Sequence, residues 1–333
     1  PTFIDLFNGV VDLQKKIIKT PGKPEDSFSD DPLRMMRAAR FMSQLNFTID
    51  PAVIAAIKSM TARLEIISAE RIRDEFIKII MSDNPRLGIT LLVETGLADI
   101  FLPEIPKLKL EIDEHHHHKD VYEHTLTVLE QAIALEERLG GPNLTLRLAA
   151  LLHDIGKPKT KELITGGGVS FHHHEVVGSR LCKERMKKLR FDNHIIKDVA
   201  QLVFLHLRFH GYGNGEWTDS AVRRYVRDAE ELLIHLHLLT RADCTTRNQK
   251  KAEGLAKTYD QLEERIALLM EQEELNKIRP DLSGEQIMEI LSIKPSPAVG
   301  KAYDFLLELR LEHGPLGEEK AKAELLNWWK LQN

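Results

Sequence analysis

A histidine and an aspartate stand side by side at the end of an apolar helical run. The run 147–152 (RLAALL) leads directly into His153 and Asp154, and Gly156 then ends it. A charged carboxylate in an apolar setting is costly unless it is paired or bound to a cation. Two interpretations are open for this pair alone: a satisfied core histidine beside a helix-capping aspartate, or one part of a metal site.

Four other segments each place a polar side chain on an otherwise apolar helical face. Apolar neighbours lie at the spacings of an amphipathic helix in each of them. A single histidine of this kind is usually satisfied locally, but several imidazoles and acids within one stretch are hard to bury separately. A shared cation removes that cost because it supplies the opposite charge. The predicted metal ligands are His124, His153, Asp154, His174, His206 and Asp243.

The predicted ligands offer nitrogen and oxygen without a thiolate. This donor set suits one or two divalent ions of Mn, Fe, Co, Ni, Zn or Mg better than a structural zinc site. An open site of this kind activates water and polarises phosphoryl oxygens, which predicts phosphoester hydrolysis. Lys157 follows Asp154 by three residues and is the candidate catalytic residue, since its ammonium could hold a phosphate.

Three further polar clusters keep more than one interpretation. Arg223, Arg224 and Arg227 lie on one predicted helix and either bind RNA phosphates or form a solvated face. Gly166–Gly168 is interpreted as a hairpin turn rather than a phosphate cradle. His115–His118 is interpreted as an exposed loop, with contact to substrate or metal as the alternative.

A second candidate site lies at a predicted helix start. Asp31 and Arg34 are three residues apart, so both can face one ligand. The carboxylate accepts a hydrogen bond from an amino group, and the guanidinium donates to a ring nitrogen or carbonyl. Cytosine and adenine present that pattern, whereas guanine and uracil present the reverse. The pair therefore predicts nucleotide binding that accepts C and A; the alternative is a helix cap beside a surface arginine.

Composition limits the class of protein. The chain has 333 residues, 42% of them hydrophobic and 29% charged, as in a soluble globular protein with more than one domain. Its net charge of −5 means that nucleic-acid contact must use local patches. Cys182 and Cys244 are far apart, which excludes a disulfide scaffold and favours the cytoplasm. No apolar run approaches the roughly 20 residues that span a bilayer, so no membrane partner is expected.

Apolar spacing predicts an all-α fold with at most one short β-hairpin, at Leu163–Phe171. Residues 20–29 are interpreted as a polar linker. Helical patterns begin at Asp31, where a cap is followed by proline, and they continue over most of 114–250. The other predicted helices are 51–62, 69–82, 85–96, 251–275, 284–292, 297–313 and 317–331.

The order of the predicted ligands resembles that of HD-domain metal phosphohydrolases. In this resemblance His124, the pair His153–Asp154 and Asp243 match the four basic ligands. His174 and His206 match the two extra histidines of dinuclear members. The neighbouring histidines at 172 and 173 remain alternatives to His174.

The chain as a whole resembles bacterial class II tRNA nucleotidyltransferases (CCA-adding enzymes) and poly(A) polymerases, downstream of their catalytic head. Asp30–Arg34 resembles the base-selecting motif, usually Glu-Asp-x-x-Arg. The end of the head is resembled by residues 5–13, and the next neck helix by residues 68–75 (SAERIRDE). A tRNA-contacting tail segment is resembled by residues 293–300 (IKPSPAVG). The resemblance implies four parts: 1–30, remnant of the head and linker; 31–108, nucleotide-selecting and RNA-binding neck and body; 109–250, HD phosphohydrolase domain; 251–333, RNA-binding helical tail.

The resemblance implies a protein that extends RNA 3′ ends, tRNA or other, with Mg²⁺ and ATP or CTP. The head's Gly-Ser turn and paired aspartates have no counterpart here, so we expect the chain to retain only metal-dependent phosphohydrolase activity. The rival hypotheses are a stand-alone HD phosphohydrolase of a small nucleotide and a non-enzymatic, metal-stiffened RNA-binding module. Addition of CCA, of A alone or of poly(A) stays open, as does the oligomeric state.

Metal analysis tests the predicted ligand set. We expect the purified wild-type chain to carry at least one transition-metal ion and Asp154→Ala to lose it, because each ligand contributes to affinity. Elemental analysis of both proteins after identical dialysis measures the difference. Equal metal content in the two proteins would contradict the assignment.

Overall fold

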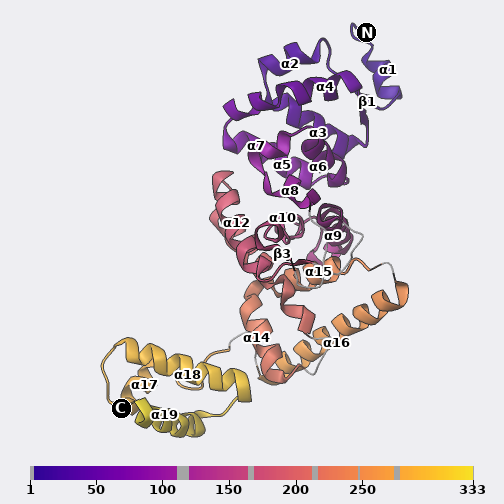
Figure 1. Cartoon of the computed structure of the whole chain (residues 1–333). Helices are drawn as coiled ribbons and strands as arrows, with labels where there is room; N and C mark the ends of the chain where they lie inside the picture. The colour runs from indigo at the N-terminus through magenta and orange to yellow at the C-terminus, as the bar shows by residue number, and fades with distance from the viewer. Residues whose placement is uncertain are drawn as a thin grey trace. The chain divides into compact units, whose positions relative to one another are not determined.

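The structure is a computed structural model that describes residues 4–110, 120–163, 169–211, 217–246, 248–273 and 278–332 (Figure 1). Helices dominate it, which confirms the all-α fold class. The chain forms two compact units, the first made of Pro1–Leu207 with Ile234–Thr245, the second of Arg208–Leu233 with Thr246–Asn333. Among the described residues, no helix combines the length and apolar character needed to cross a membrane.

The predicted helices are present, with ends that differ by a few residues. The first unit contains α1 (Gly9–Gln14), α2 (Pro24–Asp30), α3 (Leu33–Leu45), α4 (Pro51–Met60), η1 (Thr61–Ile66), α5 (Ala69–Ile80), α6 (Pro85–Glu94), α7 (Leu97–Phe101), α8 (Glu104–Lys107), η2 (Leu108–Leu110), α9 (Val121–Leu135), η3 (Glu136–Leu139), α10 (Leu144–Leu152), α11 (Lys157–Thr160), α12 (His174–Lys188), α13 (Asn193–Leu205) and α15 (Leu233–Asp243). The second contains α14 (Asp219–Ala229), η5 (Glu230–Leu232), α16 (Gln249–Glu273), α17 (Gly284–Leu291), α18 (Pro297–His313) and α19 (Glu318–Gln332), and η4 (His206–Gly211) lies at the boundary.

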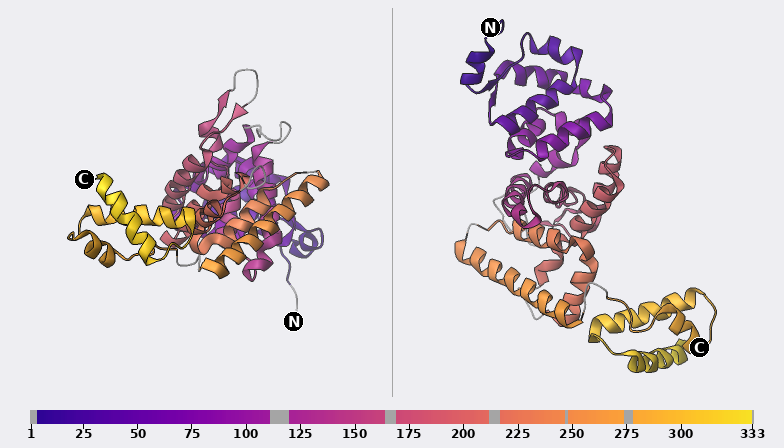
Figure 2. Two further views of the ribbon diagram at one scale, coloured as in Figure 1. Left: turned by 90° about the horizontal axis from the view of Figure 1, so that it is seen from below. Right: turned by 180° about the vertical axis from the view of Figure 1, so that it is seen from behind.

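Strand structure is limited to two short pairs in the described part of the chain. β3 (Glu162–Leu163) and β4 (Val169–Ser170) pair antiparallel, so the predicted hairpin is present and begins one residue earlier. It projects from the helices around it (Figure 2). β1 (Ile17–Ile18) and β2 (Thr48–Ile49) form a parallel pair that the alternation of residue types did not predict.

The segment interpreted as a polar linker contains helix α2. Pro24 occupies the first helical turn, where its fixed φ favours a helix and its missing N–H costs nothing. Phe28 is only 1% exposed and anchors α2 in the core. One apolar residue among polar ones is therefore enough to fix this helix once a neighbour covers it.

Two of the helices that carry the predicted metal ligands, α9 and α13, pack directly on α10. Every residue of α10 from Leu146 to Leu152 is buried, so this helix has no solvated face. It contacts α9, α13 and α5, while α12 pairs with α13. The apolar run identified in the sequence is thus the central helix of this part of the first unit.

A buried arginine fixes α10 to its surroundings. Arg147 is 3% exposed, and its Nε and Nη2 donate to the two carboxylate oxygens of Glu136 at 2.8 Å each. Its Nη1 donates to the main-chain carbonyls of Ile80 (2.9 Å) and Ser82 (2.7 Å) at the end of α5. One guanidinium therefore ties the helix before the His153–Asp154 pair to two other segments.

Substitution of this arginine tests the buried pair. We expect Arg147→Met to lower the free energy of unfolding by about 3–5 kcal/mol, because Glu136 would remain buried and unpaired. The double variant Glu136→Gln/Arg147→Met should recover part of that loss, since it buries no charge. Urea unfolding followed by circular dichroism measures both. A double variant that is less stable than Arg147→Met would contradict this account.

Candidate metal centre

Six side chains from five helical segments meet in the first unit and are named here the His–Asp cluster. They come from α9 (His124), the end of α10 and the turn after it (His153, Asp154), the start of α12 (His174), the end of α13 (His206) and the end of α15 (Asp243). These are the residues that the sequence predicts as ligands. All are buried except Asp243, whose side chain is 15% exposed.

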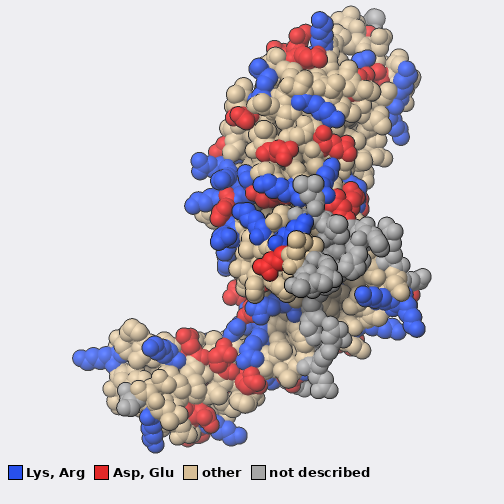
Figure 3. All heavy atoms as spheres, viewed as in Figure 1, with Lys and Arg blue, Asp and Glu red and all other residues tan. Residues whose placement is uncertain are grey.

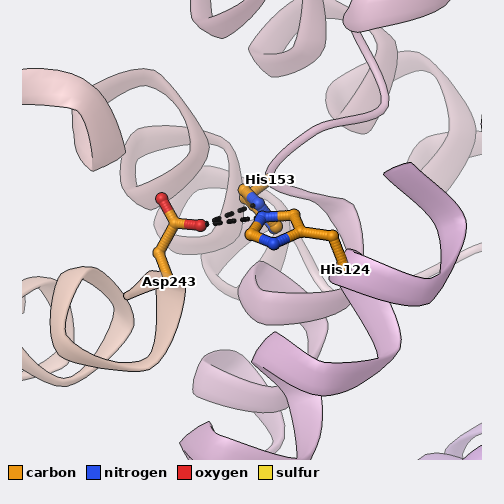
Figure 4. A group of neighbouring side chains, drawn as sticks. All are labelled: His124, His153 and Asp243. Carbon is orange, nitrogen blue, oxygen red and sulfur yellow. Dashed lines mark ion pairs between the residues drawn. The ribbon is translucent and has the colours of Figure 1, made fainter. Parts of the chain in front are cut away.

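The first half of the cluster contains His124, His153 and Asp243 (Figure 4). Oδ1 of Asp243 lies 2.9 Å from Nε2 of His124 and 3.5 Å from Nε2 of His153. The potential ligand atoms all lie within 4.8 Å of one another. Two nitrogens and one oxygen at this spacing form a group that could hold a metal ion.

The second half contains Asp154, His174 and His206. Nε2 of His174 lies 3.3 Å from Oδ1 of Asp154 and 3.3 Å from Nε2 of His206. The other oxygen of Asp154, Oδ2, lies 3.1 Å from Nε2 of His153. Asp154 therefore contacts a candidate ligand in each half of the cluster.

The chain holds its imidazoles in one orientation. Nδ1 of His153, His174 and His206 lies 2.9, 2.8 and 2.6 Å from the main-chain carbonyl three residues earlier. A carbonyl only accepts, so Nδ1 carries the proton, and Nε2 of a neutral ring keeps a lone pair directed into the cluster. Nδ1 of His124 has Thr245 Oγ1 as its partner, at 3.1 Å.

This arrangement fits a cation. Lone pairs on converging Nε2 atoms repel one another and the nearby carboxylates unless a positive charge lies among them. Nε2 of His153 is buried without a hydrogen-bond partner among the described residues. An orphaned polar atom is costly in a protein interior, and metal coordination would satisfy it.

The pKa shifts show the same demand for positive charge. Burial disfavours the charged form of His153, but the carboxylates of Asp154 and Asp243 outweigh it and raise the pKa of His153 to about 10. Burial would raise the pKa of both carboxyls, yet His153 outweighs it and holds their pKa well below the usual range. Burial, reinforced by His153 and His174, lowers the pKa of His206 to about 3. Either a proton or a metal ion could supply the charge that the carboxylates require.

Lys157 lies beside the cluster and is 5% exposed. Its Nζ is 2.9 Å from Oδ2 of Asp154 and 5.6 Å from the centroid of the Phe171 ring. The ammonium group of Lys157 thus lies next to a predicted metal ligand. Its role in binding phosphate stays a prediction.

Gly156 allows the turn after Asp154 to reach the start of α12. A Cβ at this position would collide with the carbonyl oxygen of His174 and lie 2.8 Å from the nitrogen of Gly178. The obstacles are main-chain atoms, which cannot rotate away as a side chain can. The absence of a side chain at Gly156 is therefore what lets Asp154 and His174 meet.

Of the three adjacent histidines, the structure brings His174 into the cluster. His172 and His173 are exposed. His115–His118 and Gly166–Gly168 lie outside the described residues, so their predicted roles have no structural counterpart here. Thr245 could not be predicted as part of the site, because a threonine two residues after Asp243 carries no signal of its own in the sequence.

Of the predicted base-reading pair, Asp31 lies between α2 and α3 and Arg34 lies in the first turn of α3, and each has its own protein partner. Asp31 accepts a hydrogen bond from Arg71 at 3.0 Å and another from the N–H of Leu33 at 3.2 Å. Arg34 donates to the carbonyl and hydroxyl oxygens of Ser27 at 3.2 and 3.1 Å. The side chains of Asp31 and Arg34 are 27% and 43% exposed, so both can reach a ligand.

The three arginines of α14 also have protein partners. Arg223 is buried, and its Nη1 donates to two main-chain carbonyls in the last turns of α18 at 3.1 and 3.3 Å. Arg224 donates to Glu312 at 2.8 Å, and Arg227 to Asp228 at 2.8 Å. Packing of α14 on α18 is the evident role of Arg223; phosphate contact by any of the three stays a prediction.

Two family models match the chain. Residues 46–108 match the model described as the probable RNA and SrmB-binding site of polymerase A, and residues 121–248 match the HD domain. All residues of the His–Asp cluster lie within the second range.

Known proteins are similar to the chain along nearly its whole length. The A-adding tRNA nucleotidyltransferase of Deinococcus radiodurans is 32% identical over 98% of this chain and 74% of its own length. The CC-adding tRNA nucleotidyltransferase of Thermus thermophilus is 29% identical over 95% of this chain and 70% of its own length. The crystal structure of the Bacillus stearothermophilus CCA-adding enzyme in complex with CTP matches this chain with a TM-score of 0.68 at 20% identity. The match covers 99% of this chain and 69% of that one, and at this identity it shows similarity of fold only.

Proposed function

Because this chain belongs to the tRNA nucleotidyltransferase family, we propose that it acts in the processing of RNA 3′ ends and hydrolyses phosphoesters at the His–Asp cluster. Residues 31–108 would select the nucleotide and bind RNA, 109–250 would form the hydrolase domain, and 251–333 would bind RNA as a helical tail. The match of 46–108 to an RNA-binding model and of 121–248 to the HD domain supports this division.

The convergence of nitrogen and oxygen donors in the His–Asp cluster carries the hydrolase proposal. His124, His153 and Asp243 would hold one divalent ion, and Asp154, His174 and His206 a second. Such a cation, when bound, polarises a phosphoryl oxygen and lowers the pKa of a water molecule. Nitrogen and oxygen donors are compatible with Mn, Fe, Co, Ni, Zn or Mg.

The chain's own groups would prepare the site for an anion. The carbonyls that accept from Nδ1 hold the imidazoles of His153, His174 and His206 with Nε2 turned inward. Lys157 would hold Asp154 through their 2.9 Å contact and place a positive charge beside the phosphate. Asp243 is the most exposed member, so the phosphoester would approach from its side.

The pair Asp31 and Arg34 would read the base of CTP or ATP for nucleotide addition with Mg²⁺. Each residue is already held by a neighbour: Asp31 by Arg71 and Arg34 by Ser27. Oδ1 of Asp31 also accepts from the N–H of Leu33, which orients the carboxylate. A base that bonds to this pair must share or replace these contacts.

Phosphate release tests the hydrolase proposal. With Mn²⁺ or Ni²⁺ we expect the wild-type chain to release phosphate from short RNAs that end in a 3′-phosphate or a 2′,3′-cyclic phosphate. Asp154→Asn should lower the rate of phosphate release by at least about 100-fold. Loss of a residue that only orients a metal ligand already lowers activity by up to about 100-fold, and loss of the ligand itself should lower it at least as much. Asp198→Asn, on α13 and outside the cluster, serves as the matched control and should keep the wild-type rate.

The outcomes separate the rival functions. Bound metal without phosphate release would favour a metal-stiffened RNA-binding module and contradict the hydrolase. Release from small nucleotides but not from RNA ends would favour a stand-alone phosphohydrolase.

Nucleotide binding tests the base-reading pair. We expect wild type to bind CTP and ATP about 10-fold more tightly than GTP and UTP, since hydrogen bonds to charged groups are each worth about 1.5–3 kcal/mol. Arg34→Ala should remove the preference, while Arg37→Ala, exposed one turn further along α3, should keep it. Isothermal titration calorimetry measures all four nucleotides. If Arg34→Ala still preferred CTP and ATP over GTP and UTP, Arg34 would not be the residue that recognises the base.

A further inference from the structure

Helix α12 carries a cationic face that the metal cluster does not use. Arg180, Lys183, Lys187 and Lys188 are exposed and follow the i, i+3, i+7, i+8 spacing of one helical face. They are named here the α12 ridge. The opposite face of α12 is buried through Leu181, Cys182 and Met186. The helix is thus held by an apolar face and presents a basic one to solvent.

The charges of the α12 ridge are not balanced by ion pairs. No acidic side chain in the described ranges forms an ion pair with any of its members, and Glu184 is the one carboxylate within the face. The arginines of α14 differ, because Glu308 and Glu312 pair with Arg224. In a chain with a net charge of −5, an unbalanced cluster of this kind is a local positive patch.

The α12 ridge is fastened to the segment that matches an RNA-binding family model. Arg185 forms a bidentate pair with Glu104, with contacts of 2.9–3.1 Å. Arg73 of α5 donates to the main-chain carbonyl of Arg190, just beyond α12. Glu104 and Arg73 both lie within the matched residues 46–108. Figure 3 shows Lys and Arg side chains gathered over α12.

We propose that the α12 ridge binds the phosphate backbone of RNA. This proposal rests on the proposed RNA-processing function and adds a docking surface to it. Lysines and arginines that lack acidic partners gain from phosphate neutralisation and counterion release, and they read the backbone rather than the bases. His174 in the metal cluster begins the same helix, about 21 Å from Lys188 at the helical rise per residue. RNA on the ridge therefore lies between residues 46–108 and the His–Asp cluster.

A charge-matched pair of triple variants tests the α12 ridge. Lys183→Gln/Lys187→Gln/Lys188→Gln removes three charges from the ridge. The control, Lys15→Gln/Lys16→Gln/Lys23→Gln, removes three exposed charges near the chain start, outside residues 46–108. The probe is a fluorescein-labelled RNA hairpin with a single-stranded 3′ end, and anisotropy titrations are run with chelator between about 50 and about 200 mM salt.

We expect the ridge variant to bind the hairpin at least about 10-fold more weakly than wild type and to reduce the salt slope by about 2. The control should stay within about 2-fold of wild type. Equal losses in both triple variants, or an unchanged ridge variant, would overturn the ridge as an RNA surface. No RNA binding by wild type would instead reject the RNA-processing function on which the proposal rests.

The ridge variant must also keep its fold for the comparison to count. Its far-ultraviolet circular dichroism and metal content should match those of wild type, because Lys183, Lys187 and Lys188 are exposed and lie outside the His–Asp cluster. Single substitutions Lys183→Gln and Lys187→Gln should each give an intermediate affinity. Loss of binding without change in these structural readouts supports the ridge.

Discussion

Two carboxylates that need positive charge, one of them buried and the other partly buried, determine the structure around the His–Asp cluster. Asp154 and Asp243 are surrounded by imidazoles whose Nε2 atoms turn inward, and main-chain carbonyls hold three of those rings from behind. The apolar interior makes uncompensated charge expensive, so the helices can pack at this point only if a proton or cation is shared. Lys157 supplies one positive charge from outside the cluster. The remaining donors suit a divalent ion.

The sequence predicts the cluster because each member interrupts an apolar helical face, which is visible without coordinates. Helix α18 is predictable with both ends correct, since proline and glycine bracket Pro297–His313. Arg71, the partner of Asp31, is not predictable, because that contact joins residues 40 positions apart. Helix α2 is not predictable either, because the single apolar residue Phe28 gives no periodicity. Local patterns therefore reveal which faces are buried, but not which distant groups complete a hydrogen bond.

The partners of arginine and lysine side chains are also not predictable from local sequence patterns. In sequence, Arg223 and Lys187 are both cations on amphipathic helices. In the structure, Arg223 is buried and donates to main-chain carbonyls of α18, whereas Lys187 is exposed. The difference arises from tertiary packing, because the carbonyls that Arg223 reaches belong to a helix more than 70 residues later in the chain. A cluster of positive charge in a sequence is therefore informative about binding only after its neutralising partners are known.

The close approach at Gly156 has a consequence for flexibility. The turn after Asp154 and the first residues of α12 touch through main-chain atoms, with no side chain between them to take up movement. A shift of the start of α12 toward this turn is therefore blocked, and a shift away opens a gap that close-packed interiors do not tolerate. The spacing between Asp154 and His174 is thus fixed by contact between main-chain atoms. The two residues are held in place because Gly156 has no Cβ, rather than by an additional hydrogen bond.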